Sequence, residues 1–589
     1  MSSGLINTRM TARYVLLALC LAVFAAFMIW PILLTISGGF VTSGEDGQKQ
    51  FTLQYIFGVF ADPVQREGLI NSLLIAVMTT TLCLIISIPL AVLGTTFDFR
   101  GKAIFSALIL VPMILPPFVG VIGLRQLLGR FGAINALLVD FGWIDPAHPL
   151  DFIGGARFWG VVIMEALHLY PIIYLNATAS LANLDPSLEQ AAENLGASRW
   201  TRFRRITLPL ILPGLFAGGT IVFIWSFTEL GTPLMFDYYA VTPVQVFWGI
   251  QEMADNPRPY ALVAVMLGTS VLLYALGKLV FGGKAYAMAT RAGTQATSRK
   301  LGLGPGLLAA LPFALITAVA VLPHIGVILA SFSEPGSWYQ SVLPTQWTGS
   351  HYAGALTHPL ASGSIHNSLL YSSLAVVVDI GLGVLIAWLI VRGRVRGAGL
   401  LDSLAMLPLA VPGLVLAFGY VAMSLQIGQM FTGAGAETPN WLQVVGENPN
   451  PIVFLVIAYA IRRLPYVVRA AVAGMQQTSG ELEEAAVNLG ASPLYAARRV
   501  IIPLIMANLI AGGLLAFSFA MLEVSDSLIL AQTENNYPIT KAIYTLFERL
   551  GDGPYIASAM GVWGMALLTV TLVGASVMIG KKLGSIFRV

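Results

Sequence analysis

The chain has 589 residues, of which 57% are hydrophobic and only 10% are charged, and its formal net charge is +3. Because a soluble domain carries about 25% charged residues, this composition excludes an ordinary soluble globular protein. A charge this close to zero gives no indication of a nucleic-acid partner, and we expect none. Cys20 and Cys83 both lie in apolar segments, so neither a disulfide framework nor a thiolate metal site is predicted.

Twelve apolar segments follow one another along the chain, each about long enough to cross a bilayer as a helix. They cover residues 14–36, 69–93, 103–127, 157–176, 209–231, 259–281, 305–332, 368–391, 399–424, 451–470, 502–527 and 556–579. We therefore predict an all-α integral membrane protein with twelve transmembrane helices in a lipid bilayer.

The basic residues alternate in density from loop to loop. Residues 199–205 hold four arginines and residues 392–396 hold three, and both segments fall on the same predicted side. Because lysine and arginine favour cytoplasmic loops, this side is expected to be the inner one. Both termini are then predicted to be cytoplasmic.

The two halves of the chain repeat each other. Residues 188–198 read LEQAAENLGAS and residues 482–492 read LEEAAVNLGAS, with nine of eleven positions identical at an offset of 294. The sequence Asn-Ser-Leu-Leu occurs at both 71–74 and 367–370. Proline and glutamate positions repeat as well: Pro112 with Pro408, Pro116 with Pro412, and Glu229 with Glu523.

Six helices per half is an even number, so the two halves would share one orientation. The predicted architecture is a pair of parallel six-helix repeats, residues 1–282 and 305–589, with a pathway between them. Residues 283–304 are rich in small residues and are expected to form a cytoplasmic linker.

The repeated phrase is predicted to be a short helix on the inner side. Its apolar residues recur at helical spacing, and Gly196 or Gly490 would end it because glycine tolerates the left-handed cap. A helix with alanine on one face and glutamate on another suits a groove on a partner protein. One such loop could be an ordinary solvated segment, but two copies at half-chain spacing favour a docking function.

The spacing Ala-Ala, three residues, Gly, nine residues, Ile-x-Leu-Pro resembles the EAA loop of binding-protein-dependent ABC importer permeases. Ala191, Ala192, Gly196 and Pro209 match it in the first half, and the second copy departs only just before Pro503. Gln190 stands where the family has glutamate. The resemblance covers nearly the whole chain and is greatest to the fused ferric-iron permeases, with fused permeases for thiamine or an aminoalkylphosphonate as alternatives.

The resemblance implies a type I ABC importer permease fold in a bacterial inner membrane. In that family the loop is the coupling helix, which sits in a cleft of a cytoplasmic ATPase. Two copies of that ATPase and a periplasmic substrate-binding protein are the implied partners, and the long outer loops at residues 38–67, 132–156 and 333–365 could receive the latter. The implied coupling residues are Glu189, Gln190, Ala191, Ala192, Gly196, Glu483, Glu484, Ala485, Ala486 and Gly490.

The chain has no nucleotide-binding loop of the type G-x-x-x-x-G-K-[ST]. We therefore expect it to be no enzyme and to hold no cofactor, with ATP and Mg²⁺ bound by the separate ATPase. No firm metal site is predicted.

Carboxylates inside the membrane are the candidate substrate pathway. Glu229 and Glu523 fall within the predicted helices 209–231 and 502–527, and Asp526 would share a helical face with Glu523. Such carboxylates on the axis would suit ferric iron, because hard cations prefer oxygen ligands. Alternatively, a neighbouring hydroxyl or a buried arginine satisfies each carboxylate internally.

Four further polar residues fall in the predicted helices four and ten: Glu165, His168, Arg462 and Arg463. They are expected to be structural, and they could pair with a carboxylate across the axis between the halves.

Two other classes of protein are weaker alternatives. A secondary transporter of the major facilitator kind also has two parallel six-helix repeats, but its loop after helix two is only faintly matched by residues 98–102. The duplicated inner loop would have no role there. An integral membrane enzyme would need a polar catalytic cluster, and the sequence contains no His-rich or Ser/His/Asp constellation.

Overall fold

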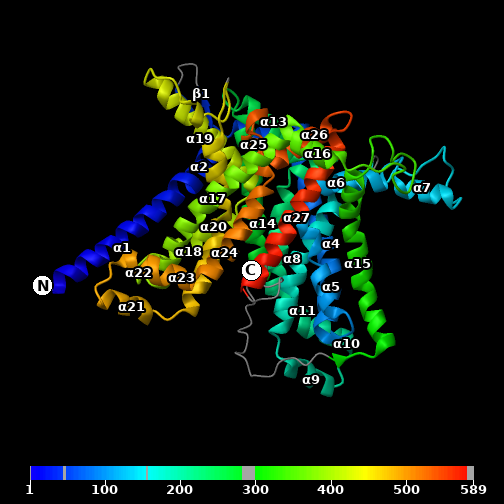
Figure 1. The fold of residues 1–589 in the computed structure, drawn as a ribbon, viewed down its shortest axis with the longest axis horizontal. Coiled ribbons are helices and arrows are strands. Elements are labelled where there is room, and N and C mark those ends of the chain that lie inside the picture. The colour runs from blue at the N-terminus through cyan, green and yellow to red at the C-terminus, as the bar shows by residue number, and fades with distance from the viewer. Residues whose placement is uncertain (1, 44–47, 154–156, 282–298, 447, 580–589) are drawn as a thin grey trace.

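Long helices run between two ends of the molecule in the computed structural model (Figure 1). The structure describes residues 2–43, 48–153, 157–281, 299–446 and 448–579. The predicted linker therefore lies outside the described residues up to position 298. The first half contributes the long helices α1 (Ser2–Phe24), α2 (Trp30–Gly38), α4 (Pro63–Thr96), α8 (Arg157–Ala182), α11 (Leu208–Phe227) and α14 (Arg258–Phe281). The second half contributes α15 (Leu303–Ser331), α17 (Pro359–Val391), α19 (Gly413–Gly433), α20 (Ile452–Gln477), α24 (Met506–Met521) and α27 (Gly553–Ile579).

Short elements occupy the two ends. One end carries α9 (Pro186–Asn194), α10 (Arg199–Arg202), η3 (Phe203–Thr207), α21 (Glu481–Asn488), α22 (Pro493–Ala496), η7 (Ala497–Ile501) and α23 (Ile502–Leu504). We call it the repeat-loop end, because residues 188–198 and 482–492 lie there. The opposite end carries β1 (Val41–Ser43), β2 (Lys49–Phe51), α3 (Gln54–Ala61), α7 (Ala133–Asp140), α13 (Thr242–Gly249), α16 (Ser350–Thr357), α25 (Ser525–Leu530) and α26 (Ile539–Glu548). Within the described residues the strands form two small pairs, β1 with β2 and β3 (Phe97–Asp98) with β4 (Arg299–Lys300).

The all-helical membrane architecture is confirmed, but the number of spans is not. Within the described residues, nine helices are long and apolar enough to cross a membrane, or eleven if each of two bent pairs is one span. The remaining predicted span falls on α20, which is less apolar because it carries Arg462, Arg463 and Arg469. The count of twelve therefore stays a prediction.

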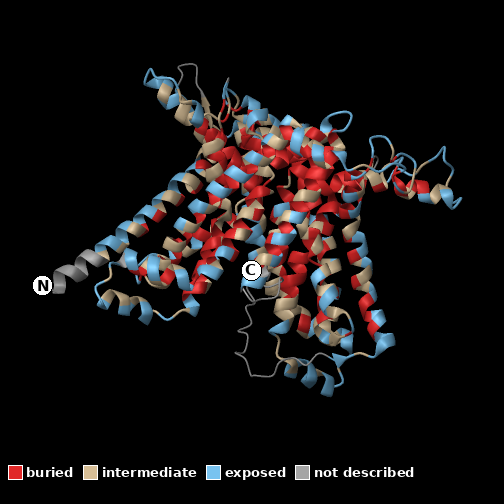
Figure 2. Cartoon of the chain, in the orientation of Figure 1, coloured by how far each residue is buried: buried red, intermediate tan, exposed pale blue. Residues whose placement is uncertain are grey.

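The surface of the long helices is apolar. Exposed side chains include Val15, Ile85, Leu307 and Val377, with exposed fractions of 61%, 63%, 71% and 69%. Buried residues gather toward the middle of the molecule and its opposite end, whereas exposed residues follow the outer faces of the helices (Figure 2). Such a surface is stable in a lipid bilayer, because apolar side chains have no free-energy cost of exposure to acyl chains.

The third predicted span of each half is broken at a proline. Lys102–Ile114 is bent by 97° against Pro117–Asp140. Proline disfavours a helical conformation in the residue before it, and Leu115 before Pro116 is extended, with φ −106° and ψ 124°. In the second half, three residues separate η5 (Leu407–Leu409) from α19, and the last of these residues is Pro412. The repeated prolines thus mark breaks, which open space inside the bundle.

The first helix of each half packs against the other half. α15 crosses α6 (Pro117–Leu128), and α2 crosses α19. Both crossings depend on a glycine at the same position of the repeat. A Cβ added at Gly123 would lie 2.2 Å from the Pro323 carbonyl oxygen, and one added at Gly419 would lie 2.7 Å from that of Pro31. Only glycine allows these backbones to approach so closely.

The repeated Asn-Ser pair ties helices to loops at the opposite end. In the first half, Asn71 Nδ2 donates to the Ala240 carbonyl at 2.8 Å, and Ser72 Oγ accepts from the Thr242 amide at 2.9 Å. In the second half, Asn367 and Ser368 make the equivalent bonds to the residues that precede and begin α26, at 3.2 and 2.7 Å. The repeated Asn-Ser pair therefore determines where α13 and α26 begin. The sequence repeat thus shapes both ends of the molecule.

Candidate functional site

The two copies of the repeated loop lie at the same end of the molecule and stand apart from each other there (Figure 1). Both short helices end as the sequence predicts. Gly196 and Gly490 are in the left-handed conformation, with φ +79° and +95°. The Ala197 amide then donates to the Ala192 carbonyl at 3.0 Å, and the second copy makes the same bond at 3.0 Å. This is the Schellman cap, which uses the glycine to satisfy free carbonyls at the helix end.

One glutamate in each loop is turned toward the body of the protein. Glu189 Oε1 accepts from Thr207 Oγ1 at 2.5 Å, and Glu483 Oε1 accepts from Trp388 Nε1 at 3.0 Å. These two equivalent hydrogen bonds tie both loops to the body of the protein. The position that carries Gln190 in one copy and Glu484 in the other is exposed in both.

The ten predicted coupling residues together form an accessible surface. Most are exposed, and the others are half-buried; the exposed ones are Glu189, Gln190, Ala191, Gly196, Glu484, Ala485 and Gly490, and the half-buried ones are Ala192, Glu483 and Ala486. Leu195 and Leu489 also stand in solvent, with exposed fractions of 88% and 90%. Each loop therefore presents one fully accessible leucine at the equivalent place.

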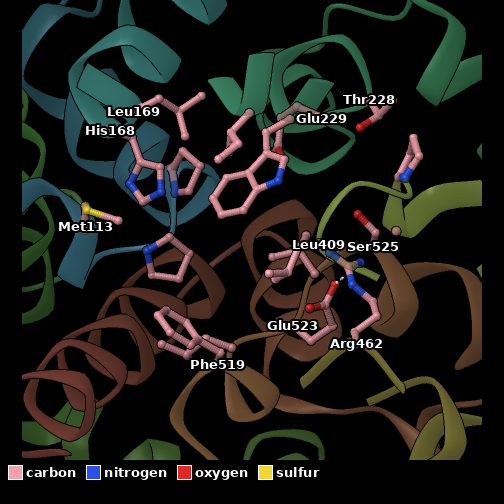
Figure 3. Close-up of a pocket in the computed structure, with 18 of the residues that line it drawn as sticks. Met113, His168, Leu169, Thr228, Glu229, Leu409, Arg462, Phe519, Glu523 and Ser525 are labelled. Carbon is pink, nitrogen blue, oxygen red and sulfur yellow. Dashed lines mark hydrogen bonds and ion pairs between the residues drawn. The ribbon is translucent and has the colours of Figure 1, made fainter. Parts of the chain in front are cut away.

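A cavity of about 300 Å³ lies between the two halves. The broken helices line it on both sides, since Met113, Pro116, Leu409 and Pro412 all face it. Its polar lining comes from both halves, as Figure 3 shows in part; it consists of Glu165, His168, Ser226, Thr228, Glu229, Arg462, Arg463, Tyr466, Glu523 and Ser525. A space of this size could hold a hydrated metal ion or a small molecule.

The predicted place of the carboxylates within helices is wrong. α11 ends at Phe227 and α24 ends at Met521, so Glu229 and Glu523 lie in the breaks that follow these helices. Asp526 does not share a helical face with Glu523, because Glu523 lies between α24 and α25, and α25 begins only at Ser525. Glu229 and Glu523 nevertheless reach the cavity, and Asp526 is fully buried behind it.

Glu523 is held by two arginines. Arg462 Nη1 donates to one of its oxygens at 2.9 Å, and Arg463 Nη2 donates to the other. Arg462 also lies 3.7 Å from Asp526 Oδ2. The arginines therefore pair within their own half, and the expected pairing across the axis is not found among the described residues.

The first half has a different arrangement at the equivalent place. His168 is the repeat counterpart of Arg462, and its Nδ1 bonds to the Pro112 carbonyl at 2.9 Å. Glu229 Oε1 accepts from the amide and the hydroxyl of Thr232, both at 3.2 Å. Glu229 and Glu523 are equivalent in the sequence repeat, but they therefore lie in different environments.

Glu165 was not assigned to the pathway from the sequence. It is 2% exposed and lines the cavity, and its Oε2 accepts from Ser226 Oγ. Only its place inside an apolar segment could have indicated a function, because its position on the helix does not show which neighbours it meets.

The halves meet again at the opposite end, around Lys541 of α26. Its ammonium lies 4.9 Å from the centre of the Phe247 ring of α13, 5.6 Å from that of Tyr537 and 5.9 Å from that of Tyr544. Its Nζ also donates to the Leu528 carbonyl at 3.3 Å. Burial lowers the pKa of Lys541 to about 8, and Glu548 opposes the shift. The cation thus sits in a ring cage that joins both halves.

This depressed pKa predicts a pH dependence for Lys541→Met. Above its folded pKa of about 8 the buried lysine is neutral, whereas an exposed lysine stays protonated up to about 10.4. Burial of the charged lysine therefore lowers the free energy of unfolding by its full amount below pH 8, and this destabilisation decreases as the pH rises toward 10. The difference in Tm between the variant and the wild type should change from pH 7.5 to pH 9.5 in favour of the wild type. A difference that does not depend on pH would contradict the assignment, and Lys49→Met, which alters an exposed lysine, is the control.

Comparison with known proteins relates both halves to one family. The family described as binding-protein-dependent transport system inner membrane component matches residues 83–282 and again residues 379–577. A ferric transport system permease protein of Actinobacillus pleuropneumoniae is 25% identical over 559 residues, covering 93% of this chain and 75% of that protein. An Fe(3+)-transport system permease protein of Haemophilus influenzae is 24% identical over 522 residues, covering 88% of this chain and 90% of that one. A molybdenum transport system permease protein of the same organism is 37% identical over 165 residues, covering 28% of this chain and 69% of that one.

Proposed function

The chain belongs to the family of binding-protein-dependent transport system inner membrane components, in a fused form that carries the family domain twice. From this premise we propose that it is the permease subunit of an ATP-driven importer and that it passes ferric iron into the cytoplasm. The observation that carries the proposal is the duplicated loop, exposed at one end of the molecule in two copies with the same cap.

The partners follow from that loop. Each copy would enter a cleft of one ATPase subunit, so a single chain would engage two copies, and those subunits would bind ATP and Mg²⁺. The permease itself would then be no enzyme. The segments around α3, α7 and α16, at the end away from the loops, would receive a periplasmic substrate-binding protein.

The same proposal fixes the topology. The two repeats, residues 1–282 and 305–589, would each contribute six spans in the same orientation, with residues 283–304 as the cytoplasmic linker. The repeat-loop end would face the cytoplasm together with both termini. The arginines of the loops, such as Arg199 and Arg498, support this orientation, because basic residues favour the inner side.

Ferric iron is proposed on two grounds. Three of the relatives that match most of this chain are named as ferric permeases, and a fourth is named only as a probable ABC transporter permease. The molybdenum permease matches under a third of the chain. The cavity also contains carboxylates from both halves, and a hard cation prefers such oxygen ligands.

Transport would proceed by alternating access around this cavity. The loops stand apart, while α13 and α26 meet at the opposite end through Lys541 and Phe247. This arrangement suits a state that is closed on the outside. ATP binding would draw the two loops together and separate α13 from α26.

The proposal predicts that the loops transmit ATP hydrolysis to transport. Replacing both Gln190 and Glu484 by arginine should reduce ATP-dependent uptake into vesicles by about tenfold or more, because the new charges would meet the ATPase cleft at both contacts. Both positions are exposed, so the variant should fold normally. Vesicles would contain the permease, its ATPase and its binding protein, with ferric iron as the cargo.

The matched control replaces the same two residues by alanine, which removes their polar groups without reversing charge. It should lose less activity than the arginine variant. Uptake that stays unchanged in the arginine variant, or an ATPase that never co-purifies with the wild-type chain, would overturn the proposed function.

A further inference from the structure

The carboxylates that line the cavity differ in whether an arginine contacts them, and the difference follows the two halves of the chain. Glu523 has an arginine on each oxygen, at 2.9 Å for Arg462 and at a shorter contact for Arg463. Glu165 and Glu229 line the same cavity, and neither makes an ion pair within the part of the chain that the structure describes. The repeat explains this difference, because His168 and Leu169 stand where the second half has its two arginines.

Glu165 shows the lack of a partner most clearly. Its side chain is 2% exposed, and Ser226 donates to Oε2 alone. Oε1 is buried and accepts no hydrogen bond of ordinary geometry among the described residues, and the other hydroxyl near this carboxyl is that of Thr79. A buried carboxylate oxygen without a partner is costly, since burial removes the water that would otherwise solvate it.

Glu229 is partly satisfied, but only by neutral groups. The amide and hydroxyl of Thr232 both donate to Oε1. Arg462 acts on Glu229 electrostatically, but its guanidinium is already in contact with Glu523 and Asp526. The pair Glu165 and Glu229 therefore adds two carboxyl groups to the cavity without a contacting cation from the described part of the protein.

We propose that Glu165 and Glu229 are the carboxylates that contact the transported metal cation, and that Glu523 is a positioning residue fixed by its arginines. The inference deepens the proposed function and rests on it. It assigns the cargo contact to the first half of the repeat alone, where the sequence equivalence had suggested one carboxylate from each half.

Two carboxylates are fewer ligands than a permanent metal site needs, which suits an ion that must pass through the cavity. Among the described residues there is no group of three or more histidine, cysteine, aspartate or glutamate side chains that could hold a metal ion. A pathway must bind its ion well enough to admit it and weakly enough to release it. Two carboxylates beside a cavity of about 300 Å³ leave the other ligand positions to water, which a hard cation accepts.

The same arrangement argues against an anionic cargo. The arginines of the cavity are committed to Glu523 and Asp526, so they offer an anion little uncompensated charge. An oxyanion in the cavity would also meet Glu165 and Glu229. Like charges at close range disfavour such a complex.

The test uses isosteric neutralisation. Glu165→Gln and Glu229→Gln keep an oxygen that accepts from Ser226 or Thr232 and remove only the charge. Each should lower ATP-dependent uptake of ferric iron by about tenfold or more, the loss expected when a charged contact is removed. Each should leave the Tm unchanged or raise it, because a buried charge without a partner is gone.

Glu523→Gln should behave in the opposite way, since it breaks two buried ion pairs. Its Tm should fall, and its uptake per folded molecule should fall less than that of the other two variants. Asp255→Asn, which alters an exposed carboxylate, is the control for both measurements. Full uptake by Glu165→Gln and Glu229→Gln, or a larger loss per folded molecule in Glu523→Gln, would overturn the inference.

A chemical readout separates this inference from the proposed function. The purified permease would be treated with dicyclohexylcarbodiimide, which modifies buried carboxyl groups that lack an ion pair, and the products mapped by mass spectrometry. Glu165 and Glu229 should be modified and Glu523 spared, and ferric citrate should protect the first two more than citrate alone. Failure of the wild type to take up iron would reject the proposed substrate, whereas wild-type uptake with equal modification of Glu523 would reject only the inference.

Discussion

Replacing Arg462 by methionine is expected to destabilise the protein by about 3–5 kcal/mol, the usual cost of removing one partner from a buried ion pair. Arg462 contacts Glu523 at 2.9 Å and Asp526 at 3.7 Å, and both carboxylates are buried. Methionine would fill much of the same space, so the loss would come from the uncompensated charge. Thermal unfolding of the purified protein in detergent would measure it.

A second substitution tests that explanation. Adding Asp526→Asn to Arg462→Met removes the carboxylate that is left without a contacting arginine, because Glu523 keeps its contact with Arg463, so the double variant should recover part of the lost Tm. Arg462→Lys should be intermediate, because lysine keeps the charge but cannot present two nitrogens in a fixed plane. If Asp526→Asn lowers the Tm of Arg462→Met by as much as it lowers the Tm of the wild type, the contact between Arg462 and Asp526 makes no specific contribution to stability.

Replacing both Gly196 and Gly490 by valine is expected to abolish co-purification of the ATPase and uptake with it. Both glycines are in the left-handed region, which costs a residue with a side chain about 1–2 kcal/mol, and a β-branched one at least as much. Each cap holds a helix of only nine or eight residues that is mostly exposed, so little else maintains its shape. The helix ends should unwind at both contacts with the partner.

Asparagine at the same two positions is the matched control, since it tolerates the left-handed region better than other residues with side chains. The Asn variant should retain most ATPase binding and most uptake. Equal loss in the Asn and Val variants would point to crowding at the contact, because nothing lies within 4 Å of a Cβ added at either glycine in the isolated chain. Full activity in the Val variant would contradict a role for the cap.

Prediction from the sequence succeeded where the signal was local or repeated. The glycine caps were predicted from residue type and spacing, and the structure places both in the left-handed region. The prolines at 112, 116, 408 and 412 were recognised as a repeat, but their consequence was not, because a periodic apolar segment reads as one helix whether or not it bends.

The carboxylates show the limit of such reasoning. Their burial and their equivalence could be predicted, but not their partners. The arginines lie about sixty residues before Glu523 in the chain and reach it only because α20 packs against α24. Glu165 gained its importance in the same way, since Ser226 and the cavity come from elements distant in sequence.

The sequence by itself determined that this is a helical membrane protein built from two related halves, each with the same capped loop, because composition, periodicity and duplication are written in neighbouring residues. Only the tertiary structure decided which charges are neutralised and which face the cavity without a cation. The physical reason is that the energy of a buried charge depends on what lies within a few ångströms of it, and packing between distant helices sets those neighbours.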